Sequence, residues 1–167
     1  MLRRVLITGA GSGIGAGIAE ALAKKGHEIV VSDVVRSAAE EVAAGIVAKG
    51  GKAQVCVMDV GKMDSITAGV ASLERPVDVL INNAGIQHVA RLEEFPPERF
   101  QQLLNVMLFG ACMLTRACLP AMRERGFGRI INIGSIHALV GSPYKSAYVA
   151  AKHGLIGMKD VLVWVQI

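Results

Sequence analysis

The sequence has few aromatic residues and lacks long uninterrupted apolar runs, and each shortage narrows what the chain can be. Aromatic residues make up 4% of the chain whereas apolar residues make up 52%, so we expect an aliphatic core, which suits a parallel sheet covered on both faces. No apolar run reaches the roughly 18 residues that a transmembrane helix needs. The N-terminal MLRRVLITG enters a predicted strand at once, without the apolar stretch of a signal peptide.

Cysteine is also scarce. Cys56, Cys112 and Cys118 are odd in number and show no CxxC spacing. Buried free thiols in a reducing cytoplasm explain this pattern better than a disulfide or a metal site. We therefore expect a cytoplasmic protein with no metal site and no membrane partner.

Runs of positive charge are missing as well. The formal net charge is +4, but the 18 lysines and arginines never stand more than two together and are not interleaved with aromatic residues. This distribution argues against a nucleic-acid partner. A modest basic bias suits a protein that binds small anionic molecules.

What the chain does have is a regular alternation of short aliphatic segments and helical ones. Strands are predicted at Arg3–Thr8, Glu28–Asp33, Ala53–Met58, Val77–Asn82 and Arg129–Gly134. Helices are predicted at Ile14–Lys25, Ser37–Lys49, Met63–Leu73, from Pro97 to about Arg125 with a bend at Pro120, and from near Ser146. The alternation predicts an α/β fold in which a doubly wound, Rossmann-type parallel sheet of five legible strands has helices on both faces. We expect one domain over residues 1–167.

A glycine-rich segment joins the first predicted strand to the first predicted helix. Its candidate cofactor-binding residues are Thr8, Gly9, Gly11, Ser12, Gly13, Ile14 and Gly15. Glycines let the backbone turn tightly and approach a pyrophosphate, whose charge is favoured at a helix N-terminus. Within a βαβ unit this motif indicates dinucleotide binding more strongly than a structural turn.

Asp33 ends the second predicted strand, about 20 residues after the glycines, where a carboxylate meets the ribose hydroxyls of a bound dinucleotide. Its charge would repel the 2′-phosphate of NADP. Ser12 stands where a lysine or arginine could have offset that repulsion. We therefore expect NAD as the cofactor; the alternative is a turn aspartate that faces solvent.

Three further residues are expected to converge on one pocket. Tyr148 and Lys152 lie four apart at the start of the last helix, so they share a face. Ser135 follows the fifth strand, and in open α/β sheets the ligand crevice lies beyond the carboxyl ends of the strands. Each feature also has a purely structural interpretation: a serine at a strand end is usually a capping residue, and a Tyr–Lys pair at this spacing usually lies on a helix surface.

Their chemistry fits hydride transfer at a carbonyl carbon. A tyrosine with a pKa near 10 is about 0.1% ionised at pH 7, a deficit of roughly 4 kcal/mol for a base. An ammonium about 4 Å away at an effective dielectric near 20 supplies about that much. Tyr148 would be the base, Lys152 its electrostatic activator, and Ser135 a hydrogen-bond donor to the substrate oxygen.

Together with the glycine segment, these residues resemble the short-chain dehydrogenase/reductases, from the first strand to about Lys159. The resemblance extends to Asp59 and Val60, where the family contacts adenine, and to Asn82, Asn83, Ala84 and Gly85, which in the family steady the sheet near the cofactor. Asn105 matches the family asparagine that holds a water in a proton relay. The resemblance also implies that Tyr148 and Lys152 contact the cofactor and that the protein assembles as a homotetramer.

Within the family, the chain is most similar to bacterial 3-hydroxybutyrate dehydrogenases. That resemblance implies that Gln87, His137 and Lys145 hold a substrate carboxylate, with Ser135 and Tyr148 at the reacting oxygen. A buried carboxylate needs a cation and further donors, and Lys145 lies three residues before the proposed base. When such residues occur singly, a lysine or glutamine more often lies on the surface and a histidine more often has its hydrogen bonds satisfied within the protein.

The resemblance ends in the last part of the chain. The family continues into a sixth strand, a Pro-Gly motif, a substrate lid and a seventh strand, and these 167 residues carry no proline after Pro143. We expect the apolar segment Val161–Ile167 either to cap the last helix or to mark a fragment. Two alternatives therefore stand beside a 3-hydroxybutyrate dehydrogenase. One is a non-catalytic NAD-binding remnant, and the other is a family member that acts on 3-oxoacyl or polyol substrates.

Overall fold

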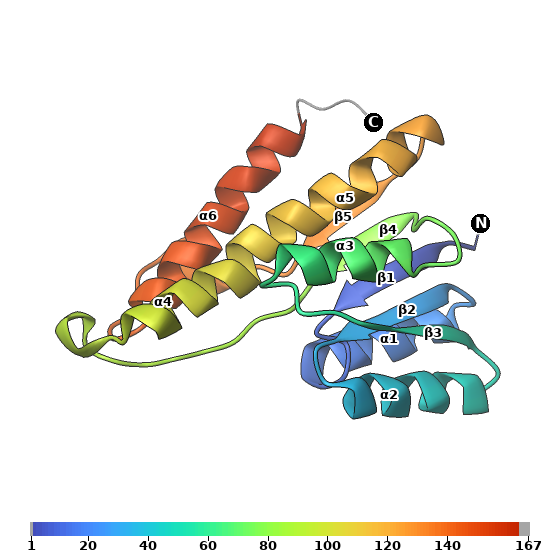
Figure 1. Cartoon of the computed structure of the whole chain (residues 1–167), viewed down its shortest axis with the longest axis horizontal. Coiled ribbons are helices and arrows are strands. Elements are labelled where there is room, and N and C mark those ends of the chain that lie inside the picture. Colours follow the sequence, from blue (N-terminus) through green and yellow to red (C-terminus); the bar gives the residue numbers. More distant parts are fainter. Residues whose placement is uncertain (1, 164–167) are drawn as a thin grey trace.

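The computed structural model describes residues 2–163, with side chains as far as residue 158. Five strands form the sheet: β1 (Arg4–Thr8), β2 (Glu28–Asp33), β3 (Lys52–Val57), β4 (Val79–Asn82) and β5 (Arg129–Asn132). The α-helices are α1 (Gly13–Lys24), α2 (Arg36–Ala48), α3 (Met63–Ala71), α4 (Pro97–Leu104), α5 (Gly110–Glu124) and α6 (Ser146–Val163). Figure 1 shows their arrangement.

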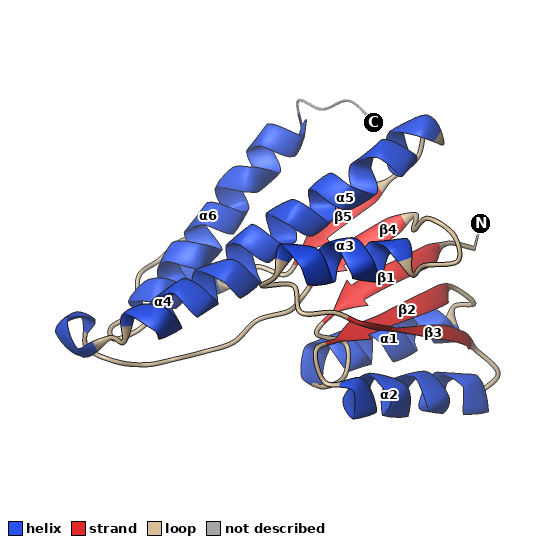
Figure 2. Cartoon of the chain, viewed as in Figure 1, coloured by secondary structure: helices blue, strands red, loops and turns tan. Residues whose placement is uncertain are grey.

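All five strands are parallel, in the order β3-β2-β1-β4-β5. The chain winds outward from β1 to β3 and then crosses back to β4 and β5 on the other side of β1. This reversal confirms the predicted Rossmann-type arrangement, in which the carboxyl ends of β1 and β4 flank a crevice. Figure 2 shows the helices that accompany the strands.

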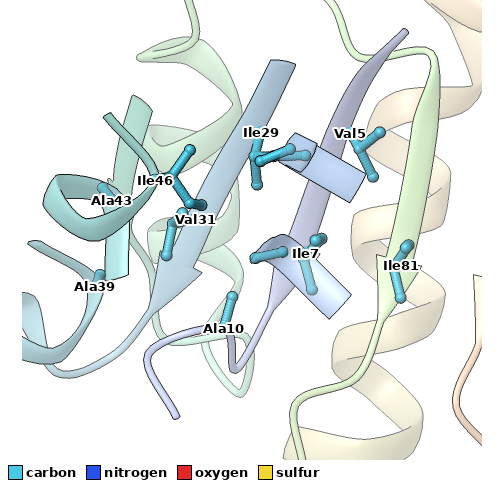
Figure 3. Close-up of a cluster of buried hydrophobic side chains, with 11 residues drawn as sticks. Val5, Ile7, Ala10, Ile29, Val31, Ala39, Ala43, Ile46 and Ile81 are labelled. Carbon is cyan, nitrogen blue, oxygen red and sulfur yellow. The ribbon is translucent and has the colours of Figure 1, made fainter. Parts of the chain in front are cut away.

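Alternation along each strand sends neighbouring side chains to opposite faces of the sheet. Val5 and Ile7 of β1 pack in one cluster with alanines of α1 and α2 (Figure 3). Leu6, between them, packs in the other cluster with residues of α3 and α5. Each large aliphatic side chain buried in this way contributes about 1.5–3 kcal/mol. Both faces of the central strand are thus covered, as the aliphatic composition predicts.

Arg4 departs from this aliphatic pattern. It is fully buried, and its Nε lies 3.1 Å from a carboxylate oxygen of Glu28. The same guanidinium donates to the Arg75 carbonyl oxygen at 2.7 Å and to the Gln54 side chain. A buried arginine needs such partners because an unpaired charge in the interior is costly.

The largest difference from the sequence prediction lies in the long helical region. It is divided by a π-helical turn, η2 (Asn105–Phe109), between α4 and α5. Hydrophobic periodicity does not reveal such a turn because one extra residue is inserted without breaking the helix. The remaining boundaries differ by a few residues. For example, β5 ends at Asn132 rather than Gly134, and β4 begins at Val79 rather than Val77.

Two further expectations need adjustment. Cys56 and Cys118 are buried free thiols as predicted, whereas Cys112 is only half-buried. The helical stretch Pro97–Glu124 is long and apolar enough to cross a membrane by length and composition, although no uninterrupted apolar run in it is that long. Leu114 and Met122 of this stretch are buried in the sheet core, and core helices of soluble proteins meet the same criterion. The side chains of the terminal apolar segment, residues 161–167, lie outside the described residues.

Candidate cofactor and catalytic site

The glycine segment is shaped by close backbone contacts at the carboxyl end of β1. Gly9 and Gly13 have φ angles of +61° and +55°, a region that favours glycine. A Cβ on Gly15 would lie 2.3 Å from the carbonyl oxygen of Gly9, and one on Gly11 would lie 2.9 Å from an oxygen of Asp33. The segment therefore requires glycine at these positions for its own geometry.

The start of α1 offers what an anion needs. Ser12 is the N-cap residue, but within the described residues no side chain caps the helix, and the first turn holds no acidic residue. Its first N–H groups therefore have no side-chain partner. The side chain of Ile14 is 69% exposed, so this turn borders open space. The residues present thus fit a dinucleotide pyrophosphate, through backbone N–H groups and the helix dipole.

Asp33 is held beside the same segment. One carboxylate oxygen accepts from the Gly11 N–H at 2.9 Å, and the other accepts from the Val35 N–H at 3.0 Å. These two bonds fix the carboxylate at the end of β2, next to the turn that precedes α1. Each oxygen retains a lone pair that can accept from a further hydroxyl.

Thr8 and Asn83 join the ends of β1 and β4. The Thr8 hydroxyl oxygen accepts from the N–H groups of Asn83 and Ala84, both at 3.1 Å. The Asn83 side chain donates in return to the carbonyl oxygens of Thr8 and Gly9. Gly85 follows on the exposed side of this junction. Asn83 thus holds the backbone of the glycine segment in place through its hydrogen bonds.

The end of β3 is connected to the π-helical turn. Val60 is buried in the core, and the Asp59 carboxylate accepts from Gly61 N–H and lies 3.2 Å from Lys62 Nζ. A Cβ on Gly110, just after the π-helical turn, would lie 2.5 Å from the Val60 carbonyl oxygen. Asn105 opens this turn and accepts from the Gln101 side chain at 2.8 Å. π-helical turns occur frequently at functional sites.

Tyr148 and Lys152 face the same side of α6. The Lys152 Nζ lies 5.7 Å from the centroid of the Tyr148 ring. Lys152 is 5% exposed, and its ammonium donates to the Ile133 carbonyl oxygen just beyond β5 at 2.6 Å. Burial lowers the pKa of Lys152 below its ordinary 10.5. Two N–H groups of the ammonium remain for other partners.

Ser135 and His137 lie in the loop after β5. The Ser135 hydroxyl accepts from the His137 N–H at 3.2 Å and thereby caps a short 3₁₀ helix, Ile136–Ala138. Among the described residues, its own hydrogen has no acceptor. The His137 ring packs edge-on against the Tyr148 ring, with 6.1 Å between the ring centroids. The buried Nδ1 of His137 has no hydrogen-bond partner among the described residues.

The remaining predicted substrate residues are less closely placed. Gln87 is exposed, and its side-chain oxygen accepts from the N–H of His88. Lys145 is half-buried, immediately before α6. Within the described residues, no hydrogen bond or ion pair joins Gln87, His137 and Lys145. The structure thus brings Tyr148, Lys152 and His137 together directly, and places Lys145 beside them in the chain.

Sequence reasoning missed two structural roles. One is the Thr8 hydroxyl as the acceptor that joins β1 to β4, which no pattern within either segment indicates. The other is the Ile133 carbonyl oxygen as the acceptor for Lys152. Both roles depend on contacts between segments far apart in the chain, so no local signal could have indicated them.

Known proteins resemble this chain over most of its length. The family model described as short chain dehydrogenase matches residues 3–163. Two curated relatives are D-beta-hydroxybutyrate dehydrogenases, from Cupriavidus necator and Rhizobium meliloti, at 43% and 42% identity over 95% of this chain. A solved gluconate 5-dehydrogenase from Burkholderia cenocepacia, in complex with NADP and tartrate, superposes with a TM-score of 0.90 at 33% identity and covers 98% of this chain and 66% of its own. This chain spans 63% of the length of each of the two curated relatives.

Proposed function

The chain belongs to the short chain dehydrogenase family, and from this membership we propose that it is the cofactor-binding and catalytic part of an NAD-dependent oxidoreductase. The reaction would interconvert a small hydroxy acid, 3-hydroxybutyrate first among them, and its keto acid. The observation that carries the proposal is the buried Lys152 ammonium held beside the Tyr148 ring, at the carboxyl edge of the sheet.

Asp33 supports NAD over NADP. Its carboxylate is fixed between two backbone N–H groups, so it cannot turn away from an added phosphate without breaking both bonds. Ser12 supplies no compensating cation. A 2′-phosphate would therefore meet a fixed like charge, whereas ribose hydroxyls would meet an acceptor.

The proposed chemistry divides among four side chains. A nicotinamide cofactor bound at the glycine segment and Asp33 would supply the hydride acceptor. Tyr148 would take the hydroxyl proton as the carbon–oxygen double bond forms, and Lys152 would stabilise the phenolate. Ser135 would donate its free hydroxyl hydrogen to the substrate oxygen. Asn105 would hold the water through which the proton leaves, on the basis of its place in the family.

The substrate assignment rests on Lys145 and His137. A small hydroxy acid buries a full negative charge, which needs a cation and further donors. The buried His137 Nδ1, which has no partner in the described part of the chain, could donate to a carboxylate. Gln87 would join them after its side chain releases the His88 N–H. The similarity to two hydroxybutyrate dehydrogenases supports the same substrate.

A direct assay tests the proposal. The protein is incubated with 3-hydroxybutyrate and either NAD or NADP, and formation of the reduced cofactor is followed by absorbance. We expect turnover with NAD and at least about tenfold less with NADP. Tyr148→Phe should lose turnover but still bind NAD, because the aromatic ring remains while the hydroxyl that accepts the proton is gone. Turnover retained in Tyr148→Phe would remove this residue as the base, and a preference for NADP would overturn the cofactor assignment.

The substrate class is tested at Lys145. Lys145→Met should raise KM for 3-hydroxybutyrate at least about tenfold, which is the effect of losing one ion pair in a partly buried site. KM for a neutral alcohol of similar size should change little. Equal effects on both substrates would contradict a carboxylate contact at Lys145.

Two alternatives are separated by the same measurements. NAD binding without turnover on any substrate would indicate a non-catalytic NAD-binding remnant. Turnover of gluconate or a 3-oxoacyl substrate in place of 3-hydroxybutyrate would indicate another member of the family. Gluconate is included among the test substrates because the chain is similar to a gluconate 5-dehydrogenase.

Organisation and location complete the proposal. We propose that residues 1–167 form one domain, and that the protein assembles as a homotetramer in the cytoplasm. Phe109, at the junction of the π-helical turn and α5, is 39% exposed and offers an apolar contact for association. Light scattering on the purified protein measures the assembly.

A further inference from the structure

A hollow lies at the end of the sheet opposite the candidate site. Its volume is about 960 Å³, and it is formed between the C-terminal halves of α1 and α2 and the amino ends of the strands. Gly17, Ala21 and Lys24 of α1 line one side, and Ile46 and Lys49 line the other. This size is within the range of small-molecule pockets. We call it the α1–α2 groove.

The groove is positively charged. Five cationic side chains and two acidic ones line it, for a net charge of +3. Glu28 is paired with Arg4 and Arg75, and Glu20 is paired with Lys49 at 3.4 Å. Lys24 and Lys52 have no carboxylate within ion-pair distance among the described residues. Their charges are therefore available to a ligand.

The helix ends do not cancel this charge. C-terminal carbonyl groups carry partial negative charge, which would repel an anion. At α1, however, Gly26 N–H donates to the Ala23 carbonyl oxygen, and His27 N–H donates to that of Leu22. At α2, Gly51 N–H donates to the Ile46 carbonyl oxygen at 3.0 Å. These local hydrogen bonds cap the two helices, and the charge of roughly −0.5 at each C-terminus is smaller than the net side-chain charge of +3 in the groove.

Gly17 leaves the backbone of α1 open toward the groove. It lies on the exposed side of α1, in mid-helix, where glycine is less favourable than any residue except proline. A Cβ at this position would meet nothing within 4 Å, so no packing contact in the described structure requires glycine. Gly15 in the same helix does have such a requirement. A glycine that faces an open groove allows a ligand to approach the backbone closely.

We propose that the α1–α2 groove binds a small amphiphilic anion, with its carboxylate or phosphate head at Lys24 and Lys52 and its apolar body against the exposed Ala21 of α1. This site lies at the opposite end of the sheet from the glycine segment, so a ligand there would not compete with the dinucleotide. The proposal does not depend on the proposed catalytic function.

Calorimetric titration tests binding with three probes: octanoate, octyl phosphate and 1-octanol. At least one anion should bind with 1:1 stoichiometry, and 1-octanol should bind at least about tenfold more weakly because it lacks the charge. The two anions separate a carboxylate head from a phosphate head. Absence of binding by both anions, or equal binding of 1-octanol, would overturn the proposal.

Matched variants locate the site. Lys24→Glu should weaken binding about tenfold, because the charge at the groove is reversed. Lys25→Glu makes the same change of net charge one residue away, outside the groove lining, and should alter affinity less than twofold. Gly17→Leu should abolish detectable binding by filling the groove. Gly45→Leu, at a glycine of α2 that also has open space but lies outside the lining, should leave affinity unchanged.

Circular dichroism melting of each variant confirms that it folds, and both glycine variants should melt no lower than the parent protein. If Lys25→Glu weakens binding as much as Lys24→Glu, or Gly45→Leu as much as Gly17→Leu, the anion binds elsewhere and the assignment to the groove fails.

Discussion

At the scale of single residues, Lys152 couples the candidate site to pH. Burial lowers its pKa below the ordinary 10.5 in the folded protein, whereas the unfolded chain keeps the ordinary value. Between these two pKa values the unfolded state binds more protons, so stability rises with pH through that window. Below the lowered pKa both states are protonated, and the full cost of burying the charge is present.

The prediction is that Lys152→Met removes this rise. Urea unfolding of both proteins at several pH values from 7 to above the ordinary lysine pKa measures it. The difference between the two curves of stability against pH isolates Lys152, because the other titrating groups are common to both proteins. One such group is the Cys118 thiol, because burial raises its pKa to about 12. A difference between the curves that does not vary with pH would contradict the prediction.

At the scale of elements, helix α1 holds two glycines with opposite requirements. A Cβ on Gly15 would lie 2.3 Å from a backbone oxygen, whereas one on Gly17 would meet nothing within 4 Å. Gly15→Ala should therefore destabilise the protein by about 2 kcal/mol or more, because the backbone must shift. Gly17→Ala should stabilise it by about 0.5–1 kcal/mol, because alanine favours the helix. Chemical denaturation measures the free energy of unfolding of both variants. Changes of the same sign would refute the conclusion that Gly15 is required by packing and Gly17 is not.

At the scale of the whole molecule, the apolar core is unevenly distributed. The two clusters on the sheet faces each contain eleven buried residues, whereas the cluster around α4 and α6 contains five, within the described part of the chain. Local stability follows buried apolar contact. Amide hydrogens of α4 and of the first turns of α6 should therefore exchange sooner than those of β1, β2 and β4. Mass-spectrometric hydrogen exchange at neutral pH tests this, and equal protection of the two regions would disprove it.

The sequence by itself determined the class of fold and the candidate residues. The alternation of aliphatic and helical segments predicted five strands, which the structure confirms within a few residues, because backbone periodicity is a local property. The glycine segment and Asp33 were predicted from their positions at strand ends, because parallel strands bring their carboxyl ends to one edge. Lys152 was predicted to share a face with Tyr148, because helical spacing alone decides that relation.

Only the tertiary structure decided how these residues are held. The Thr8 hydroxyl meets Asn83 across 75 positions of the chain, and Lys152 meets the Ile133 carbonyl oxygen across 19. The π-helical turn at Asn105 and the buried Arg4 likewise depend on packing partners from other elements. The α1–α2 groove exists because two helices lie side by side on one sheet face. Local patterns cannot specify such features, because their energies come from contacts that form only when distant segments meet.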